Sequence, residues 1–208
     1  MLSPEDVPVF VLCGGFGTRL GGSRAPLPKA MVEIGERPLL MHLLECYSRF
    51  GFRRFILCTG YRGDAIHAYF TLLPGLLCDF TLDLRNRSFA YHQNGPLPDW
   101  RITLAHTGVG SMTGCRLALA AGRYLGDAEH FAVTYGDGLT DADLADELRF
   151  HLQHGALGTV LAVNPPERFG HLSVVEDRVI CFREKPVDPN GWINGGFFFF
   201  RRGFLDYL

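Results

Sequence analysis

The sequence predicts an α/β fold of the Rossmann-like kind, with a mixed, mostly parallel sheet flanked by helices. Short apolar runs such as Val7–Cys13 are almost uninterrupted, which is typical of strands that are buried on both faces. Stretches with apolar residues at helical spacing separate these runs, and such alternation indicates a wound sheet with helices on both faces. Sheets of this kind bind ligands outside the carboxyl ends of their strands.

The elements follow one another in a regular order. The expected strands are Val7–Cys13, Phe55–Thr59, Phe80–Leu84, Trp100–Ala105, Phe131–Tyr135 and Thr159–Val163. The expected helices are Pro38–Phe50, Asp64–Leu73, Ser111–Leu125 and one that starts after Thr140 and ends near His154. Pro38 suits a first helical position, Pro74 is expected to close the second helix, and Ser111 and Thr140 are expected N-caps.

The pattern changes after Pro165 and Pro166. The next strands are expected at Leu172–Val175, Val179–Phe182 and Gly196–Phe200, and no helix is expected between them. We therefore expect a single domain over residues 1–208, in which residues 1–160 are wound as strand-helix-strand units. Residues 161–208 would be strands that cross over a site. The aromatic run Phe197–Phe200 is interpreted as core rather than as a stacking platform.

Composition excludes several classes of partner. The 208 residues carry a net charge of −2, with 47% hydrophobic and 20% charged residues. A binder of nucleic acid or of membrane surfaces needs a basic excess that this chain lacks. No run reaches the ~18 apolar residues of a membrane span, and the acidic start does not resemble a secretory signal. The six cysteines include no CxxC pair, so we expect a cytoplasmic protein with reduced cysteines that act as small buried hydrophobes.

A glycine-rich segment follows the first expected strand. Gly14, Gly15 and Gly17 allow backbone amides to approach an anion closely, and Thr18 and Arg19 add a hydroxyl and a cationic fork. The segment is neither a Walker A loop nor a GxGxxG motif. The alternative interpretation is a turn that only requires positive φ.

Two charged residues stand at neighbouring positions of the predicted fold. Lys29 lies between the glycine-rich segment and the first helix, where its ammonium can reach a bound phosphate. Asp137 follows a buried strand between Gly136 and Gly138, which leaves room for a metal ion and a polyphosphate. Mg²⁺ favours one or two carboxylates with phosphate oxygens and water. The alternatives are a solvated lysine and an ordinary Asp-Gly turn.

The other candidate groups are less specific. Ser111 and Arg116 at a helix start could read an anion or a base edge, or they could belong to a plain capped helix. Arg168-Phe169-Gly170, Glu184-Lys185 and Asn194 offer groups suited to sugar hydroxyls and to a second phosphate, although each alone could be a surface residue. His151 and His154 are interpreted as part of a solvated helix face.

Taken in order, eight segments resemble those of the sugar-1-phosphate nucleotidylyltransferases. They are LCGGFGTRL, PLPKAMVEIGERPLLMH, TGYRGDAI, SMTGCRL, TYGDG, PPERFGHL, REKP and INGGFF. The resemblance runs from Val7 onward, and SMTG-x-RL and TYGDG point to the cytidylyl branch of that family. It implies the nucleotide-diphospho-sugar transferase type of fold.

The resemblance also implies a reaction. A cytidylyl group would pass from CTP to glucose 1-phosphate, with Mg²⁺ as cofactor, and the products would be CDP-glucose and pyrophosphate. Other specificities (dTTP, UTP or GTP) stay open, as does a non-catalytic homologue that only binds nucleotide or nucleotide sugar. No nucleic-acid or membrane partner is expected, and a homo-oligomer is left open.

Site residues carry over from the matching motifs. Those implied for the nucleotide are Leu12, Gly14, Gly15, Gly17, Thr18, Arg19, Lys29, Ser111, Arg116 and Gly136. Those implied for the sugar phosphate are Gly170, Glu184, Lys185 and Asn194, and Asp137 is the implied metal ligand. Arg19 and Lys29 are the expected catalytic cations. Residues 1–160 would then form the nucleotide-binding part and residues 161–208 the sugar-phosphate-binding part.

The sequence departs from the family pattern in places. The family usually has a lysine where Leu27 stands and an acidic pair where Gly22-Ser23 stand. Its members are also longer, with a second metal-binding aspartate in the extra segment. We therefore expect the fold to be truncated at the C-terminus, either as a fragment or as a shortened homologue with a weakened metal site.

Overall fold

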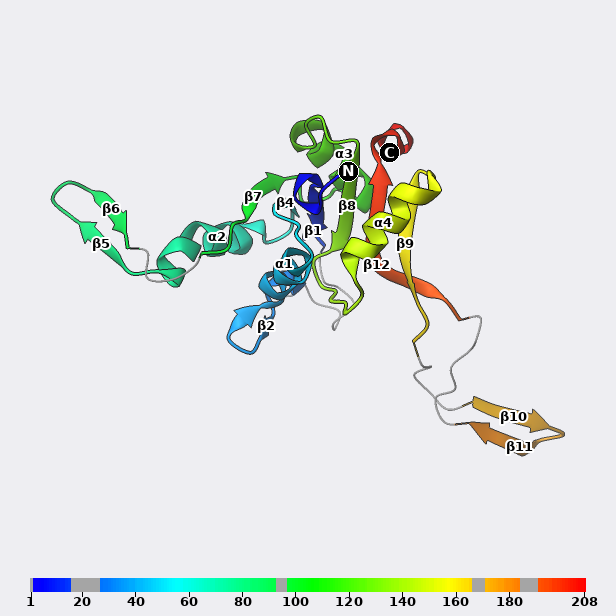
Figure 1. The fold of residues 1–208 in the computed structure, drawn as a ribbon. Coiled ribbons are helices and arrows are strands. Elements are labelled where there is room, and N and C mark those ends of the chain that lie inside the picture. Colours follow the sequence, from blue (N-terminus) through cyan, green and yellow to red (C-terminus); the bar gives the residue numbers. More distant parts are fainter. Residues whose placement is uncertain (1, 16–26, 93–96, 166–170, 184–190) are drawn as a thin grey trace.

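The computed structural model describes residues 2–15, 27–92, 97–165, 171–183 and 191–208 (Figure 1). Its strands are β1 Val9–Leu12, β2 Glu33–Ile34, β3 Arg37–Pro38, β4 Arg54–Thr59, β5 Phe80–Asp83, β6 Ser88–Tyr91, β7 Arg101–His106, β8 His130–Tyr135, β9 Gly158–Val163, β10 His171–Val175, β11 Arg178–Arg183 and β12 Ile193–Arg201. Its α-helices are α1 Leu39–Arg49, α2 Gly63–Leu77, α3 Thr113–Tyr124 and α4 Leu144–His154. Short 3₁₀ helices span Pro4–Asp6, Lys29–Met31 and Arg202–Tyr207.

A six-stranded sheet in the order β7-β4-β1-β8-β12-β9 forms the centre of the molecule. β7, β4, β1 and β8 are parallel to one another, whereas β12 is antiparallel to both β8 and β9. The predicted mixed, mostly parallel sheet is therefore confirmed. Because β12 is inserted between β8 and β9, the late part of the chain contributes directly to this sheet.

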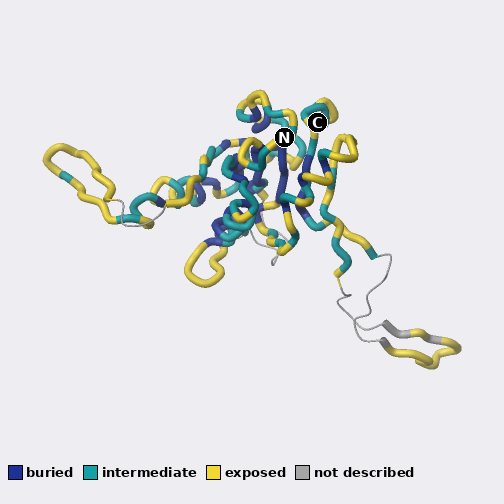
Figure 2. The backbone as a smooth tube through the Cα atoms, viewed as in Figure 1, coloured by how far each residue is buried: buried dark blue, intermediate teal, exposed yellow. Residues whose placement is uncertain are grey.

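Alternate residues of each strand pack on opposite faces of the sheet, since side chains in a strand alternate in direction. One face buries Val9 and Val11 with Phe55 and the apolar side of α1. On the other face, Phe10 packs with residues of α3 in a second cluster. Figure 2 shows that the buried segments are concentrated in this sheet and in the helices against it. Helices on both faces were predicted, and the structure confirms them.

Phe197 and Phe199 confirm that the aromatic run of β12 is core. Both side chains are buried on the α1 face, where Phe197 contacts the ring of Tyr47 and Phe199 contacts that of Phe52. Phe198, on the opposite face, meets Tyr135 with ring centroids 6.0 Å apart. The strand thus packs a ring on each side of the sheet at this point.

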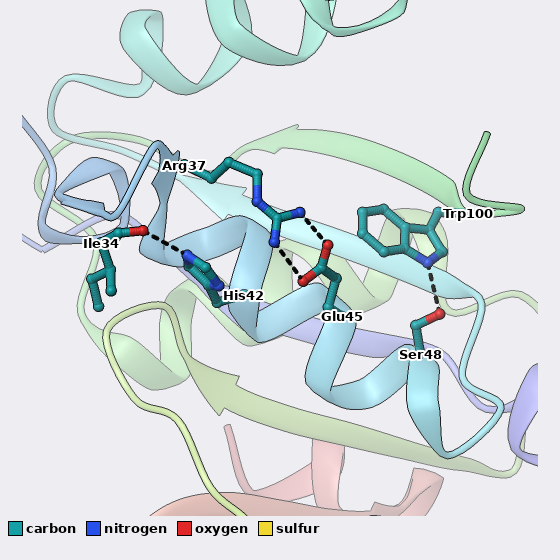
Figure 3. Close-up of polar contacts among 6 residues, drawn as sticks. All are labelled: Ile34, Arg37, His42, Glu45, Ser48 and Trp100. Atoms are coloured by element: carbon teal, nitrogen blue, oxygen red, sulfur yellow. Dashed lines mark hydrogen bonds and ion pairs between the residues drawn. The ribbon is translucent and has the colours of Figure 1, made fainter. Parts of the chain in front are cut away.

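Polar contacts anchor helix α1 to its neighbours (Figure 3). Arg37 of the β2–β3 hairpin forms a bidentate ion pair with Glu45, and His42 Nε2 lies 2.9 Å from the Ile34 carbonyl oxygen. The Trp100 indole N–H donates to Ser48 Oγ at 2.9 Å. These contacts attach the hairpin and the start of β7 to opposite ends of the helix.

Two hairpins project away from the central sheet (Figures 1 and 2). One is β5–β6, which begins just after α2, and the other is β10–β11. Their exposed side chains include Phe80, Phe89, Ile180 and Phe182. The strands Phe80–Leu84, Leu172–Val175 and Val179–Phe182 were expected from the sequence, whereas β6 was not.

Three predicted helix boundaries are wrong. α3 begins at Thr113 with Met112 as its N-cap residue, because the Ser111 hydroxyl instead donates to the Thr107 carbonyl. The N-cap of α4 is Asp143 rather than Thr140, since the Asp143 carboxylate accepts from the backbone amides of the first turn. α2 continues through Pro74 to Leu77, so this proline does not end the helix.

The interpretation of His151 as part of a solvated face is also wrong. His151 is fully buried, and its Nε2 lies 3.0 Å from His130 Nδ1 while its Nδ1 lies 2.8 Å from Thr159 Oγ1. His154 is exposed and reaches the same hydroxyl at 2.7 Å. The two residues lie on one helix and both contact Thr159 of β9, but only His151 is buried and contacts His130 of β8.

The cysteines are all free, as expected, but they do not share one environment. Cys13 and Cys58 are buried, and Cys115 and Cys181 are exposed, so the expectation that all are buried hydrophobes is wrong for the latter two. Among the described residues, no helix is both long and apolar enough to cross a membrane.

Candidate active site

A cleft of about 650 Å³ lies at the carboxyl edge of the parallel strands. Two predicted groups of residues, those after β1 and those after β8, meet there. Its lining consists of Leu12, Cys13, Gly14, Gly15, Lys29, Ala30, Gly110, Ser111, Met112, Thr113, Arg116, Tyr135, Gly136, Asp137 and Asn194. The cleft therefore collects most of the described residues that the sequence predicted for the site.

Sheet topology explains why these residues meet. β1, β4, β7 and β8 run in the same direction, so the segments that follow them all emerge at one edge. β12 runs the opposite way and begins at that edge, which brings Asn194 into the cleft. The start of α3 also faces the cleft, and the amides of a helix N-terminus favour anions.

Lys29 and Asp137 are the charged pair of the cleft. Lys29 Nζ lies 3.4 Å from Asp137 Oδ2, and the two side chains are 31% and 43% exposed. Ion pairs this exposed contribute little to stability. The pair instead presents a cation and a carboxylate side by side in the lining of the cleft, where both remain accessible to a ligand.

The glycines after β1 and β8 differ in their surroundings. Gly15 is exposed, and a Cβ added there would meet no atom of the described residues within 4 Å. A Cβ at Gly136 would lie 2.9 Å from Cys13 Sγ, so this glycine is needed for packing between the two strand ends. Burial raises the pKa of the Cys13 thiol well above its ordinary value, and this cysteine is therefore an uncharged packing group.

Arg116 lies at the inner side of the cleft and is only 4% exposed. Its Nη1 donates to the Thr59 carbonyl at 3.1 Å, to Thr107 Oγ1 at 2.9 Å and to the Gly108 carbonyl at 2.8 Å. Its Nη2 donates to the carbonyls of Gly14 at 2.8 Å and Val109 at 3.3 Å. Burial lowers the pKa of this guanidinium from its ordinary value.

Ser111 and Asn194 line the cleft with side chains that are already engaged. Ser111 Oγ donates to the Thr107 carbonyl at 2.5 Å, which leaves its lone pairs to accept from a ligand. Asn194 Oδ1 accepts from the Gly196 amide at 2.7 Å, which orients the side-chain amide. Leu12 and Gly136 contribute to the floor of the cleft.

Several predicted site residues lie outside the part of the chain that the structure describes. They are Gly17, Thr18, Arg19, Gly170, Glu184 and Lys185. Their roles, including that of Arg19 as a catalytic cation, stay predictions.

The structure adds lining residues that the sequence did not single out, among them Tyr135 and Met112. Tyr135 is 37% exposed and directly precedes the Gly136-Asp137 motif, so its position at a strand end was the available signal. Met112 is 80% exposed beside the start of α3. Its place in the SMTGCRL motif was the available signal.

A divalent cation would have one protein carboxylate in the described part of this cleft, that of Asp137. Within the described residues, no three His, Cys, Asp or Glu side chains come together as a metal-binding group. Mg²⁺ commonly accepts one carboxylate when phosphate oxygens and water complete its shell. The donor set therefore fits Mg²⁺ held jointly with a polyphosphate rather than a metal held by the protein alone.

Comparisons with known proteins identify the family of the chain. The model of the family described as "Nucleotidyl transferase" matches residues 9–208. The chain is 40% identical to glucose-1-phosphate cytidylyltransferase of Salmonella typhi over 198 residues, which cover 95% of this chain and 76% of the relative. It is 37% identical to the probable glucose-1-phosphate cytidylyltransferase of Bacillus subtilis, with the same coverage.

Solved structures share the fold. HddC from Yersinia pseudotuberculosis, in a structure complexed with GMP-PN, matches with a TM-score of 0.64 at 23% identity over 97% of this chain and 80% of that chain. A putative glucose-1-phosphate thymidylyltransferase from Bacillus anthracis matches with a TM-score of 0.64 at 18% identity, over 97% and 74% of the respective chains. The family model and the curated relatives together confirm the resemblance seen in the motifs: this chain belongs to the nucleotidyl transferase family of enzymes.

Proposed function

We propose that this chain transfers a nucleotidyl group from a nucleoside triphosphate to a sugar 1-phosphate, with CTP and glucose 1-phosphate as the substrates. The observation that carries the proposal is the cleft whose lining brings together the Lys29–Asp137 ion pair and the exposed backbone of Gly15. The curated relatives named glucose-1-phosphate cytidylyltransferase, at 37% to 40% identity, support the choice of substrates.

The chemistry needs positioning and charge neutralisation more than a base. A phosphate oxygen of the sugar 1-phosphate attacks the α-phosphorus of CTP, and the bond from that phosphorus to the bridging oxygen breaks. Pyrophosphate leaves with the electron pair, and CDP-glucose remains. Because the nucleophile is already an anion, no group has to remove a proton, and in-line alignment supplies much of the rate.

The described residues supply the matching groups. The Lys29 ammonium can donate to phosphoryl oxygens and offset the charge that develops on pyrophosphate. The exposed backbone of Gly15 and the start of α3 line the same cleft and favour anions. Asp137 would hold Mg²⁺, which when bound supplies further neutralisation of the triphosphate charge.

Pyrophosphate release tests the proposal. The chain is mixed with Mg²⁺, glucose 1-phosphate and each of CTP, dTTP, UTP and GTP, and CTP is expected to give the highest kcat/KM. No turnover with any triphosphate, in protein shown to be folded, would reject the proposed activity. Binding of CTP by calorimetry without turnover would instead identify a non-catalytic nucleotide-binding homologue.

Asp137→Asn tests the metal assignment directly. Loss of this carboxylate is expected to lower Mg²⁺-dependent turnover by about 100-fold or more while the thermal midpoint changes little, because the side chain is exposed. Asp127→Asn, at an exposed position outside the cleft, is the matched control. Equal activity of the two variants would contradict the assignment of Asp137.

A further inference from the structure

We infer that Arg116 is a positioning residue that ties together the ends of three strands behind the cleft, and that Gly60 is the position that makes room for it. The inference rests on the proposed function, because one of the tied segments, Cys13–Gly15, is the one expected to hold the triphosphate. It gives Arg116 a different role from the direct nucleotide contact that the family resemblance implies.

The acceptors of the guanidinium come from three separate places in the fold. Gly14 follows β1, Thr59 ends β4, and Thr107 to Val109 follow β7. Arginine is suited to this task because its planar fork directs several donors at fixed angles. A lysine ammonium concentrates its three donors on one atom and lacks this fork, so it cannot make the five contacts that Arg116 makes.

The same bonds engage both Nη groups of Arg116 with acceptors from the protein. The two Nη groups carry four N–H donors, and five acceptors from the protein surround them. A buried cation requires partners of this kind, since an unsatisfied one is costly. Among the ion pairs of the described residues, none involves Arg116, so these oxygens stabilise its charge.

Two glycines permit the close approach of the guanidinium. A Cβ at Gly14 would lie 2.2 Å from Arg116 Cζ, and a Cβ at Gly60 would lie 2.3 Å from Arg116 Nη1. Gly60 directly follows β4 and is not part of the cleft lining. A methyl group there would displace the end of a long side chain rather than backbone, so Gly60→Ala is expected to move Arg116 while the fold persists.

The backbone bonds between the strand ends provide a direct readout. The Cys13 amide donates to the Cys58 carbonyl, the Tyr61 amide to the Gly14 carbonyl and the Thr107 amide to the Thr59 carbonyl. If Arg116 holds these segments in register, loss of its contacts will increase local opening, which amide hydrogen exchange detects.

The experiment measures exchange by NMR in the full chain without nucleotide. Gly60→Ala, Arg116→Ala and the double variant are compared with the wild type and with Gly122→Ala, an exposed position of α3 where an added Cβ meets nothing within 4 Å. Both single variants are expected to speed exchange at the three amides by about tenfold or more, with no change in α1. The double variant should add nothing, because the clash disappears with the arginine.

An unchanged exchange rate at these amides in ligand-free Arg116→Ala would overturn the inference, and so would independent, multiplying effects of the two substitutions. A direct nucleotide contact alone predicts no change in the ligand-free protein. Hydrogen exchange does not depend on catalysis, so it tests the role of Arg116 alone. Turnover by the wild type tests the proposed function separately.

If the wild type is active, the kinetics of the variants also test the positioning role of Arg116. Gly60→Ala and Arg116→Ala are expected to raise the KM for CTP and to lower kcat/KM by about 10- to 100-fold, the scale expected for a misplacement of about 1 Å. A fall in kcat with an unchanged KM would indicate only a smaller folded fraction and would count against positioning. Gly122→Ala should retain wild-type kinetics.

Discussion

Glu147→Gln should make the protein more stable at neutral and alkaline pH. Glu147 lies in the first turn of α4, and both of its carboxylate oxygens are buried without a hydrogen-bond partner among the described residues. Burial raises the pKa of this carboxyl from 4.5 to about 7. The folded protein therefore favours the protonated acid.

The magnitude follows from the shift in pKa. Below pH 4.5 the carboxyl is protonated in both the folded and the unfolded chain, so its ionisation costs nothing. As the pH rises from 4.5 to 7, the unfolded chain releases its proton first, and the free energy of unfolding falls. The difference between 4.5 and about 7 corresponds to roughly 2–3 kcal/mol at pH 8, after allowance for partial exposure.

Urea unfolding followed by circular dichroism from pH 4 to 8 is the assay. The quantity of interest is the difference in free energy of unfolding between Glu147→Gln and the wild type, since a buried amide adds an offset that does not vary with pH. Other groups that titrate in both proteins cancel in this difference. It should grow by about 2 kcal/mol or more from pH 4 to 8 in favour of the variant.

Glu36→Gln, at an exposed position, is the control for the removal of one surface carboxylate. If the Glu147→Gln and wild-type curves run parallel across the whole range, the carboxylate is ionised without cost in the folded protein, and the reasoning fails.

The other predictions concern a buried histidine of α4 and a glycine that follows β8. Burial lowers the pKa of His151 from 6.5 to about 4. Because the unfolded chain then binds the proton more readily, the free energy of unfolding of the wild type should fall from pH 6.5 to pH 4, by at most about 3 kcal/mol. In urea unfolding, His151→Gln should make this fall smaller. An equal fall in the variant would assign it to other groups. Gly136→Ala would place a Cβ 2.9 Å from Cys13 Sγ, so a loss of about 1–3 kcal/mol is expected by thermal unfolding. Gly138→Ala, where an added Cβ meets no described atom within 4 Å, should change stability far less, and similar losses in both variants would contradict the packing argument.

Much of the fold could be predicted from local pattern. Strands that are buried on both faces read as continuous apolar runs, so β1, β4 and β8 were predicted close to their observed bounds. The same pattern predicted which strand ends would carry Gly15 and Asp137 toward a common cleft, because parallel strands place their carboxyl ends at one edge.

Element boundaries were less predictable, because they depend on which of several nearby polar groups makes the first contact. Ser111 could have capped α3, but its hydroxyl donates to the Thr107 carbonyl instead. Pro74 could have ended α2, yet the helix continues to Leu77. Neither choice is visible in the residue pattern, since both outcomes use the same amino acids.

By itself, the sequence determined the type of fold, the family and which polar residues follow the strand ends at the edge of the sheet. These depend on hydrophobic period and on short motifs, which are local properties of the chain. Only the tertiary structure decided that Arg116 is buried behind the cleft and that Gly60 accommodates it. The acceptors of that guanidinium lie as many as 102 positions away along the chain, and a residue pattern cannot show which distant carbonyls will surround a buried charge.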